Sequence, residues 1–472
     1  MNRQTLAVIV GTIALVVVGA VLMYGSPGTQ SPPVTAQGGA KAKVKAKADK
    51  ADKAEKADKA KSPRKLQDAK LVHAGEIPAD RPAAPAGSPN VVLFVLSTQR
   101  RDQWTVYGGP DGTTPFLAKQ GATGVVMMDA LSVAVDPRPS DAAIITGRYP
   151  HGLGVIEPAD KRNNNPITAD ADTLAERLAA AGWFTVGLSA NHNLNEKAGG
   201  AQGFDWYRDS QPYSLMTDQR IDAAELASKA VERVSSRTEA EKARPMFLQL
   251  AFVDSHKPIK IPPAEFKPFS GNGEVAPYRA TIRRQDDAIQ KVVEGLAAQG
   301  VTAENTVFVV IADHGEGLDM PEAHRKQHGF VLYESSVRIP WVMWGKGLAA
   351  RKVDGLASQI DLAPTVAALA GLKEQTGFDG LDLSAAVLGT GPSPRTEAYA
   401  DTLYEGANRA SIWTSAHQCQ KDFGSKDIEN DQFEDGCYDR KADPVFTKTI
   451  EDAALAAKLE KQRQDLMGKV GG

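Results

Sequence analysis

Three apolar stretches limit most strongly the fold that this chain can adopt. They cover residues 91–96, 247–252 and 306–311, and each is rich in β-branched, aromatic or leucine side chains without regular polar alternation. Such continuous runs are typical of strands that are buried on both faces of a parallel sheet. Helical patterns lie between the runs, over residues 172–180, 220–234 and 278–298. Strands that alternate with helices predict an α/β fold, with a mostly parallel sheet sandwiched by helices.

Length and charge narrow the class of protein further. A chain of 472 residues exceeds what one hydrophobic core usually covers, so we expect a large domain and a smaller one. The formal net charge of −3 is uneven, because lysine is concentrated in residues 41–65 and leaves the remainder acidic. An acidic folded part argues against nucleic acid as a partner.

The N-terminus carries a candidate membrane segment. Residues 6–24 are uncharged and apolar over a length that spans a bilayer as a helix. Arg3 precedes this run and the first lysine after it is Lys41, so the positive-inside rule places the rest of the chain outside the cytoplasm. We therefore predict a transmembrane signal anchor (1–24) and an exported globular part, periplasmic or extracellular. A cleaved signal peptide is the alternative, although no Ala-x-Ala site closes the run.

Residues 25–88 read as a tether. They begin rich in Pro, Gly and Ser and continue as a Lys/Ala-rich repeat with no apolar face that could pack.

The chain has two cysteines, Cys419 and Cys437. In an exported protein this pair predicts one disulfide, and two free thiols are the alternative.

Polar side chains follow each of the three apolar stretches. They occur in residues 97–102, 253–258 and 312–317. Ligands of parallel α/β sheets bind beyond the carboxyl ends of the strands, so these segments are the candidate site. Residues 139–148 supply a fourth segment.

The chain resembles the sulfatases of the alkaline phosphatase superfamily over residues 89–450. The resemblance is carried by 89–93 (PNVVL) with 100–102 (RRD), by 313–317 (DHGEG), by 332–340 (LYESSVRIP) and by 361–365 (DLAPT). It implies an alkaline phosphatase-like α/β domain over 89–375 and a small C-terminal α+β subdomain over 376–472.

The resemblance also implies roles for single residues. Asp313 and His314 match part of the family's divalent-metal site, and His256 and His328 match histidines that contact substrate or donate a proton. Lys326 and Arg148 match substrate-binding positions. A structural role is the alternative for His256 and Arg148, and a solvated surface lysine is the alternative for Lys326.

The reactive groups of the family are missing from this chain. Its nucleophile, a Cys or Ser that is oxidised to formylglycine, falls on Pro137, which has nothing to oxidise. The family's arginine falls on Asp141, which adds negative charge where an anionic sulfate would bind. Ser97 and Thr98 replace metal-binding aspartates, and neutral hydroxyls bind hard cations poorly. We therefore expect no formylglycine and only a weakened site for calcium or magnesium, unless Asp102 or Asp136 lies close enough to compensate.

A different hydroxyl is the remaining candidate for a nucleophile. Ser140, Ser132 and Thr98 are the nearest ones, and each would need a metal or base to activate it. Loss of a nucleophile alone lowers a rate by roughly 10⁴–10⁶.

Three hypotheses follow, and whether the protein is an enzyme is left open. The first is an envelope pseudoenzyme that serves as a binding or assembly module for sulfated or phosphorylated glycans. The second is an active sulfuric-ester or phosphoester hydrolase with a non-standard nucleophile and metal. The third is an anchored scaffold with a vestigial pocket.

Overall fold

The computed structural model describes residues 71–75, 77–156, 166–209, 221–318, 328–373, 376–426, 428 and 433–470. The predicted anchor, most of the predicted tether and Lys326 lie outside these residues. Among the residues described, no helix is both apolar enough and long enough to cross a membrane.

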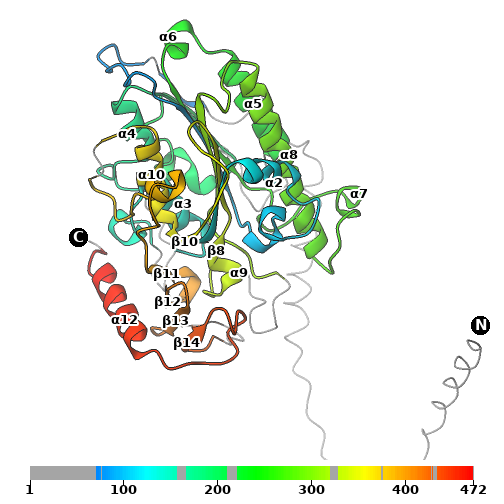
Figure 1. Cartoon of the computed structure of the whole chain (residues 1–472), viewed down its shortest axis with the longest axis vertical. Helices are drawn as coiled ribbons and strands as arrows, with labels where there is room; N and C mark the ends of the chain where they lie inside the picture. The colour runs from blue at the N-terminus through cyan, green and yellow to red at the C-terminus, as the bar shows by residue number, and fades with distance from the viewer. Residues whose placement is uncertain are drawn as a thin grey trace, which may run out of the picture. The chain divides into compact units, whose positions relative to one another are not determined.

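A mixed sheet forms the centre of the described structure (Figure 1). Its strands lie in the order β1 (Leu71–Ala74), β5 (Trp206–Arg208), β4 (Phe184–Ser189), β6 (Met246–Phe252), β2 (Asn90–Leu96), β7 (Thr306–Ala312), β9 (Trp341–Gly345), β3 (Val125–Leu131) and β10 (Arg351–Ser358), and β8 (Arg338–Ile339) pairs with β3. The central strands β4, β6, β2 and β7 are parallel to one another, whereas β1, β8 and β9 run antiparallel to the strands that they pair with.

Helices cover both faces of this sheet, as Figure 1 shows. Val91, Leu93 and Val95 of β2 belong to the core on one face, and the intervening residues belong to the core on the other. The first core is completed by α3 (Pro137–Thr146), α4 (Leu174–Ala180), α10 (Leu362–Leu369) and α11 (Ser384–Leu388). The second is completed by α2 (Pro115–Thr123), α5 (Ala223–Ser235) and α8 (Val275–Ala297). Because both faces of β2 are buried, its sequence is apolar without interruption.

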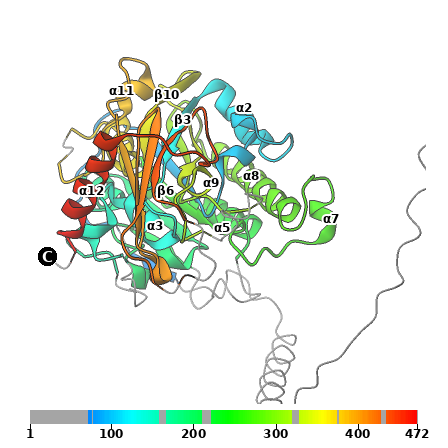
Figure 2. The ribbon, with the colours of Figure 1, turned by 90° about the horizontal axis from the view of Figure 1, so that it is seen from below.

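A second, antiparallel sheet lies in the C-terminal region (Figure 2). Its strands are β11 (Ala398–Thr402), β12 (Arg409–Trp413), β13 (His417–Asp422) and β14 (Gly436–Asp439), and α12 (Ala453–Met467) packs against it. The short helices α6 (Glu239–Lys242), α7 (Pro263–Phe266) and α9 (Glu334–Val337) complete the described α-helices.

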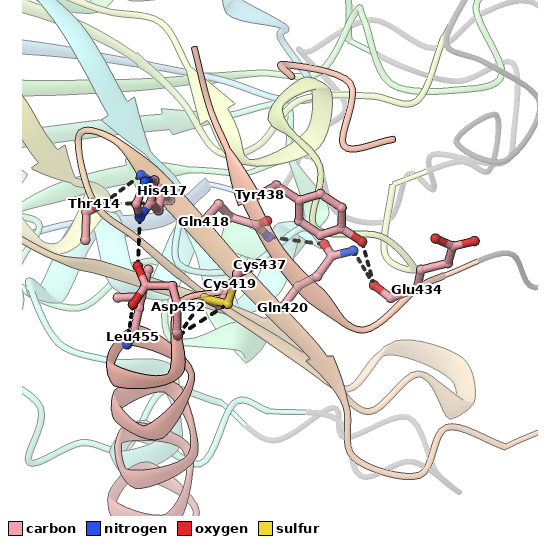
Figure 3. Close-up of a disulfide and its surroundings, with 10 residues drawn as sticks. All are labelled: Thr414, His417, Gln418, Cys419, Gln420, Glu434, Cys437, Tyr438, Asp452 and Leu455. Atoms are coloured by element: carbon pink, nitrogen blue, oxygen red, sulfur yellow. Dashed lines mark hydrogen bonds and ion pairs between the residues drawn. A yellow bond between two sulfur atoms is a disulfide. The ribbon is translucent and has the colours of Figure 1, made fainter. Parts of the chain in front are cut away.

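The predicted disulfide is confirmed. Cys419 and Cys437 face each other across β13 and β14 and form it (Figure 3). Asp452 lies beside the bridge, where its side chain accepts a hydrogen bond from the backbone N–H of Leu455 at the start of α12. The second carboxylate oxygen of Asp452 bonds to Nδ1 of His417, 2.7 Å away. The disulfide and the start of α12 therefore lie next to each other.

A buried charge network attaches α12 to the rest of the molecule. The carboxylate of Asp401 on β11 accepts hydrogen bonds from Arg463 of α12 at 2.8 Å and from Tyr399 at 3.0 Å, and His151 Nε2 lies 2.8 Å from it. Burial raises the pKa of Asp401, but His151 and Arg463 outweigh it and lower that pKa below its usual value. The backbone N–H of Asp401 also bonds to the carbonyl of Val133. The C-terminal sheet is thus fixed beside the segment that leads into α3.

The fold class predicted from the sequence is confirmed, as a mostly parallel sheet sandwiched by helices with a separate C-terminal sheet. The three apolar stretches are β2, β6 and β7, and the helical patterns are α4, α5 and α8.

Candidate functional site

The candidate site lies at the carboxyl ends of β2, β6 and β7, where the start of α3 meets them. Ser97 bonds through its N–H to the carbonyl of Phe252, and Asp313 bonds through its N–H to the carbonyl of Leu96. These bonds bring the three strand ends side by side, as the parallel register predicts.

Asp313 is held by the backbone of two neighbouring segments. Its Oδ1 accepts hydrogen bonds from the backbone N–H of Thr98 at 2.7 Å and of His314 at 2.6 Å. Thr98 reaches this position with φ of 55°, a region that a β-branched residue rarely adopts. Its hydroxyl donates to the carbonyl of Ser97 instead of facing the site. Thr98 therefore contributes its backbone to Asp313 rather than a ligand oxygen to a cation.

His314 presents a lone pair to the same place. Its Nδ1 lies 2.8 Å from the carbonyl of Gly315, so Nδ1 carries the proton and Nε2 is an acceptor. Burial lowers the pKa of His314 and keeps the ring neutral. Nε2 lies 3.7 Å from Oδ2 of Asp313, and neither atom has a hydrogen-bond partner within the described part of the chain.

Two such acceptors are the beginning of a cation site but not a complete one. Nowhere in the described residues do three or more His, Cys, Asp or Glu side chains converge as metal ligands. Asp102 does not compensate, because it is half exposed and its carboxylate is bound by Arg100. The hydroxyl of Ser97 is buried and has no partner among the described residues, but it is neutral. The donor set therefore does not fit the four-ligand cation that the resemblance implies.

Two further histidines border His314. The ring of His328 lies 4.7 Å from that of His314 and 4.9 Å from that of His256, centroid to centroid. Glu316 fixes His328, because one carboxylate oxygen accepts its backbone N–H and the other lies 3.0 Å from its Nδ1. Burial raises the pKa of Glu316, but His328 outweighs it and holds that pKa well below its usual range. The structure thus brings His256, His328, Asp313 and His314 together.

The start of α3 shows what occupies the nucleophile position. Pro137 is the first residue of the helix, where a fixed φ and a missing N–H are tolerated. Ser140 is fully buried, and its hydroxyl donates to the carbonyl of Ala134 at 3.0 Å. This bond makes Ser140 part of the helix start. Ser132 is also fully buried, and its hydroxyl has no partner among the described residues.

Asp141 is a buried acid whose hydrogen-bonding capacity is only partly used. It is 0 % exposed, and only one of its two oxygens has a partner among the described residues, the side-chain amide of Asn191 at 2.8 Å. Burial and the neighbouring carboxylate of Asp313 raise the pKa of Asp141 well above its usual value. An arginine at this position would instead balance the charge of Asp313.

Arg148 does not join the other predicted residues. It follows the C-terminal end of α3, a helix of ten residues and about 15 Å, whereas Pro137 begins it. Its guanidinium lies beside Gly152. The sequence reasoning also missed two contributors, Asn191 and the role of Glu316. Asn191 lies two residues after the last residue of β4, so its place near a strand end was the available signal.

The fold and the site define a class, a helix-covered α/β sheet whose strand ends bring carboxylates and imidazoles together. Residues 89–372 match the family model "Sulfatase". Arylsulfatase A of Bos taurus is 30% identical over 378 residues, which cover 68% of this chain and 72% of that protein. The chain belongs to the sulfatase family.

Solved structures with the same fold include Ps i-CgsB in complex with k-i-k-neocarrahexaose. It has a TM-score of 0.66 and 20% identity, and the match covers 81% of this chain and 93% of that one. A second protein, solved with its substrate D-glucosamine-2-N,6-O-disulfate, has a TM-score of 0.62 and 17% identity over 81% of this chain and 97% of its own.

Proposed function

We propose that this protein is a membrane-anchored sulfatase-family pseudoenzyme, which binds anionic glycans at the cell envelope without hydrolysing their esters. The observation that carries the proposal is Pro137 at the start of α3. A pyrrolidine ring has no atom that attacks sulfur or phosphorus. It also cannot be converted to an aldehyde hydrate.

Two of the remaining hydroxyls are poor replacements for the missing nucleophile. The hydroxyls of Ser140 and Thr98 each donate to a backbone carbonyl. Activation would require a base or a cation within reach, and the neighbouring groups supply neither in full. Asp141 stands where the family has an arginine. The side chain that would stabilise developing negative charge is therefore replaced by an acid.

The charge balance of the rim still suits an anion. His256 and His328 lie side by side, and two cationic side chains, Arg138 and Lys257, belong to the segments at the start of α3 and after β6. Because Asp141 has a raised pKa, its carboxyl repels a bound anion less than an ordinary aspartate would. These groups can bind a sulfate or phosphate substituent without a reactive atom facing it.

The nature of the ligand is inferred from similar proteins and from this rim. Two proteins of the same fold were solved with a neocarrahexaose and with a glucosamine disulfate, and a relative in Formosa agariphila is an ulvan-active sulfatase. A sulfated or phosphorylated glycan is therefore the proposed partner. The apolar run at residues 6–24 and the Lys/Ala-rich tether support attachment to the membrane with the domain outside the cytoplasm.

One observation favours the second candidate, an active ester hydrolase with an unusual metal. Oδ2 of Asp313 and Nε2 of His314 lie 3.7 Å apart and both lack a donor in the described structure, as two ligands of one cation would. In that case Asp313 and His314 would hold two positions of a divalent cation, and the chemistry that such a cation would supply is polarisation of the ester oxygen.

The two candidates differ in the fate of the glycan. The full chain in mild detergent is mixed with a sulfated carrageenan oligosaccharide, and bound oligosaccharide and free sulfate are both measured. The proposal predicts binding with the oligosaccharide recovered intact. Release of sulfate that Asp313→Ala abolishes would overturn it.

A further inference from the structure

A second pocket lies next to the candidate site, where α9 passes the chain that follows β2. It has a volume of about 210 Å³ and is lined by Arg100, Arg101, Asp102, Glu334, Ser335, Arg338, Pro444 and Val445. A pocket of this size accommodates a charged substituent together with water molecules.

The residues that line the pocket carry one more positive charge than negative charges. Three arginines face two carboxylates in the lining. Asp102 is bound by Arg100 through both oxygens, and Glu334 is bound by Arg338. The remaining guanidinium is that of Arg101.

The position and the surroundings of Arg101 suit the binding of an anion. Its guanidinium carbon lies 4.4 Å from the centroid of the Tyr107 ring, which fixes its orientation. Its Nε is buried and has no hydrogen-bond partner among the residues that the structure describes. Burial, together with the nearby charge of Arg338, lowers the pKa of Arg101. A bound anion would relieve both effects.

Ser335 supplies the second independent feature. It is 6 % exposed, it lines the pocket, and its hydroxyl has no partner in the described part of the chain. Buried hydroxyls are nearly always bonded, so an unbonded one in a pocket beside an unpaired guanidinium indicates a missing acceptor. Together Arg101 and Ser335 offer an N–H and an O–H to one oxyanion.

The pocket is adjacent to the candidate site through the backbone. Arg101 follows Thr98 by three residues, and the carbonyl of Ser335 accepts the backbone N–H of Glu316, the residue that fixes His328. An acidic polymer that bears several anionic groups is therefore the class of ligand that suits two neighbouring sites. Val445 and Pro444 add an apolar edge against which a sugar ring can pack.

We propose that this pocket, defined by Arg101 and Ser335, binds a second oxyanionic substituent of an acidic polysaccharide, a sulfate ester or a uronate carboxylate. The inference rests on the proposed function, because it extends the binding of an anionic glycan from one group to two. The pocket is a binding site and takes no part in bond cleavage.

The test compares two variants of the pocket with a matched control. Arg101→Gln and Ser335→Ala each remove one donor, and Arg283→Gln removes the same charge from a helix surface outside the pocket. Binding of a sulfated carrageenan oligosaccharide to the full chain in detergent is measured by calorimetry. We expect about a tenfold loss of affinity in Arg101→Gln and a smaller loss in Ser335→Ala. Arg283→Gln should bind within about twofold of the wild type.

Each outcome decides the inference. Ser335→Ala removes a hydroxyl that bonds to none of the described residues, so we expect it to fold as the wild type does and its weaker binding cannot be ascribed to misfolding. Wild-type affinity in both pocket variants would overturn the second site and leave the proposed function standing. If the wild type binds no oligosaccharide, the proposed function fails, and inorganic sulfate tests the pocket alone. Sulfate binding that Arg101→Gln abolishes would then support the pocket, and no sulfate binding would overturn it. An oligogalacturonate distinguishes a carboxylate ligand from a sulfate ligand.

Discussion

Replacement of Asp141 by asparagine should stabilise the protein. Asp141 is 0 % exposed, one of its oxygens lacks a partner in the described structure, and a second buried carboxylate, Asp313, faces it. A buried polar group without a partner costs about 1–3 kcal/mol. Asp141→Asn removes the charge that burial and Asp313 disfavour, keeps the shape and keeps an oxygen that accepts from the amide of Asn191. We expect the free energy of unfolding to rise by about 1–3 kcal/mol.

The matched control is the same substitution at Asp361. This residue is also 0 % exposed, but its carboxylate is bound by Arg395 and by the backbone N–H groups of Ser358 and Leu381. Breaking a buried pair of this kind costs about 3–5 kcal/mol, so Asp361→Asn should destabilise. The assay is equilibrium denaturation of both variants and the wild type at pH 7. A loss of stability in Asp141→Asn would refute the reasoning and show that Asp141 has a favourable partner, such as a bound cation.

Three further predictions concern the rest of the molecule. The double variant Cys419→Ala, Cys437→Ala opens a loop of sequence separation 18 and should lose about 3 kcal/mol in denaturation, whereas an unchanged midpoint would contradict a structural disulfide. Arg463→Met leaves the buried carboxylate of Asp401 without its arginine, which should cost about 3 kcal/mol and expose α12 to protease; protection equal to the wild type would contradict this. Burial, with the charge of a nearby arginine, lowers the pKa of His192 to about 4. The contribution of neutral His192 to the free energy of unfolding is therefore complete above the unfolded pKa of 6.5 and is lost as the pH falls toward 4. His192→Gln should flatten this pH dependence by about 1–3 kcal/mol, and an identical slope in both proteins would disprove it.

The fold could be predicted because its determinants are local. The run at 91–96 is apolar at every position since both faces of β2 are covered, and the strand has those bounds to within one residue. The exact ends of the helices were harder to predict from the sequence. Helix α5 begins at Ala223, three residues later than its pattern suggested, because Asp222 caps it by accepting the N–H of Glu225.

The site could be predicted only where the chain order fixes it. Asp313 and His314 follow β7 directly, so their place at the strand ends was readable. The pairing of Asp141 with Asn191 was not, because it joins residues separated by 50 positions through the packing of α3 on the sheet. The same applies to the pocket at Arg101 and Ser335, since nothing local in the sequence marks a hydroxyl or a guanidinium as unpaired.

The central claim is that this chain has the sulfatase fold without sulfatase chemistry. The most direct test is hydrolysis of an aryl sulfate, a phosphate monoester and a phosphonate ester by the full chain, each with calcium, magnesium, manganese or zinc added. The account predicts no turnover above that of Asp313→Ala with any metal. Turnover in the wild type that Asp313→Ala abolishes would contradict it and would require a nucleophile other than residue 137.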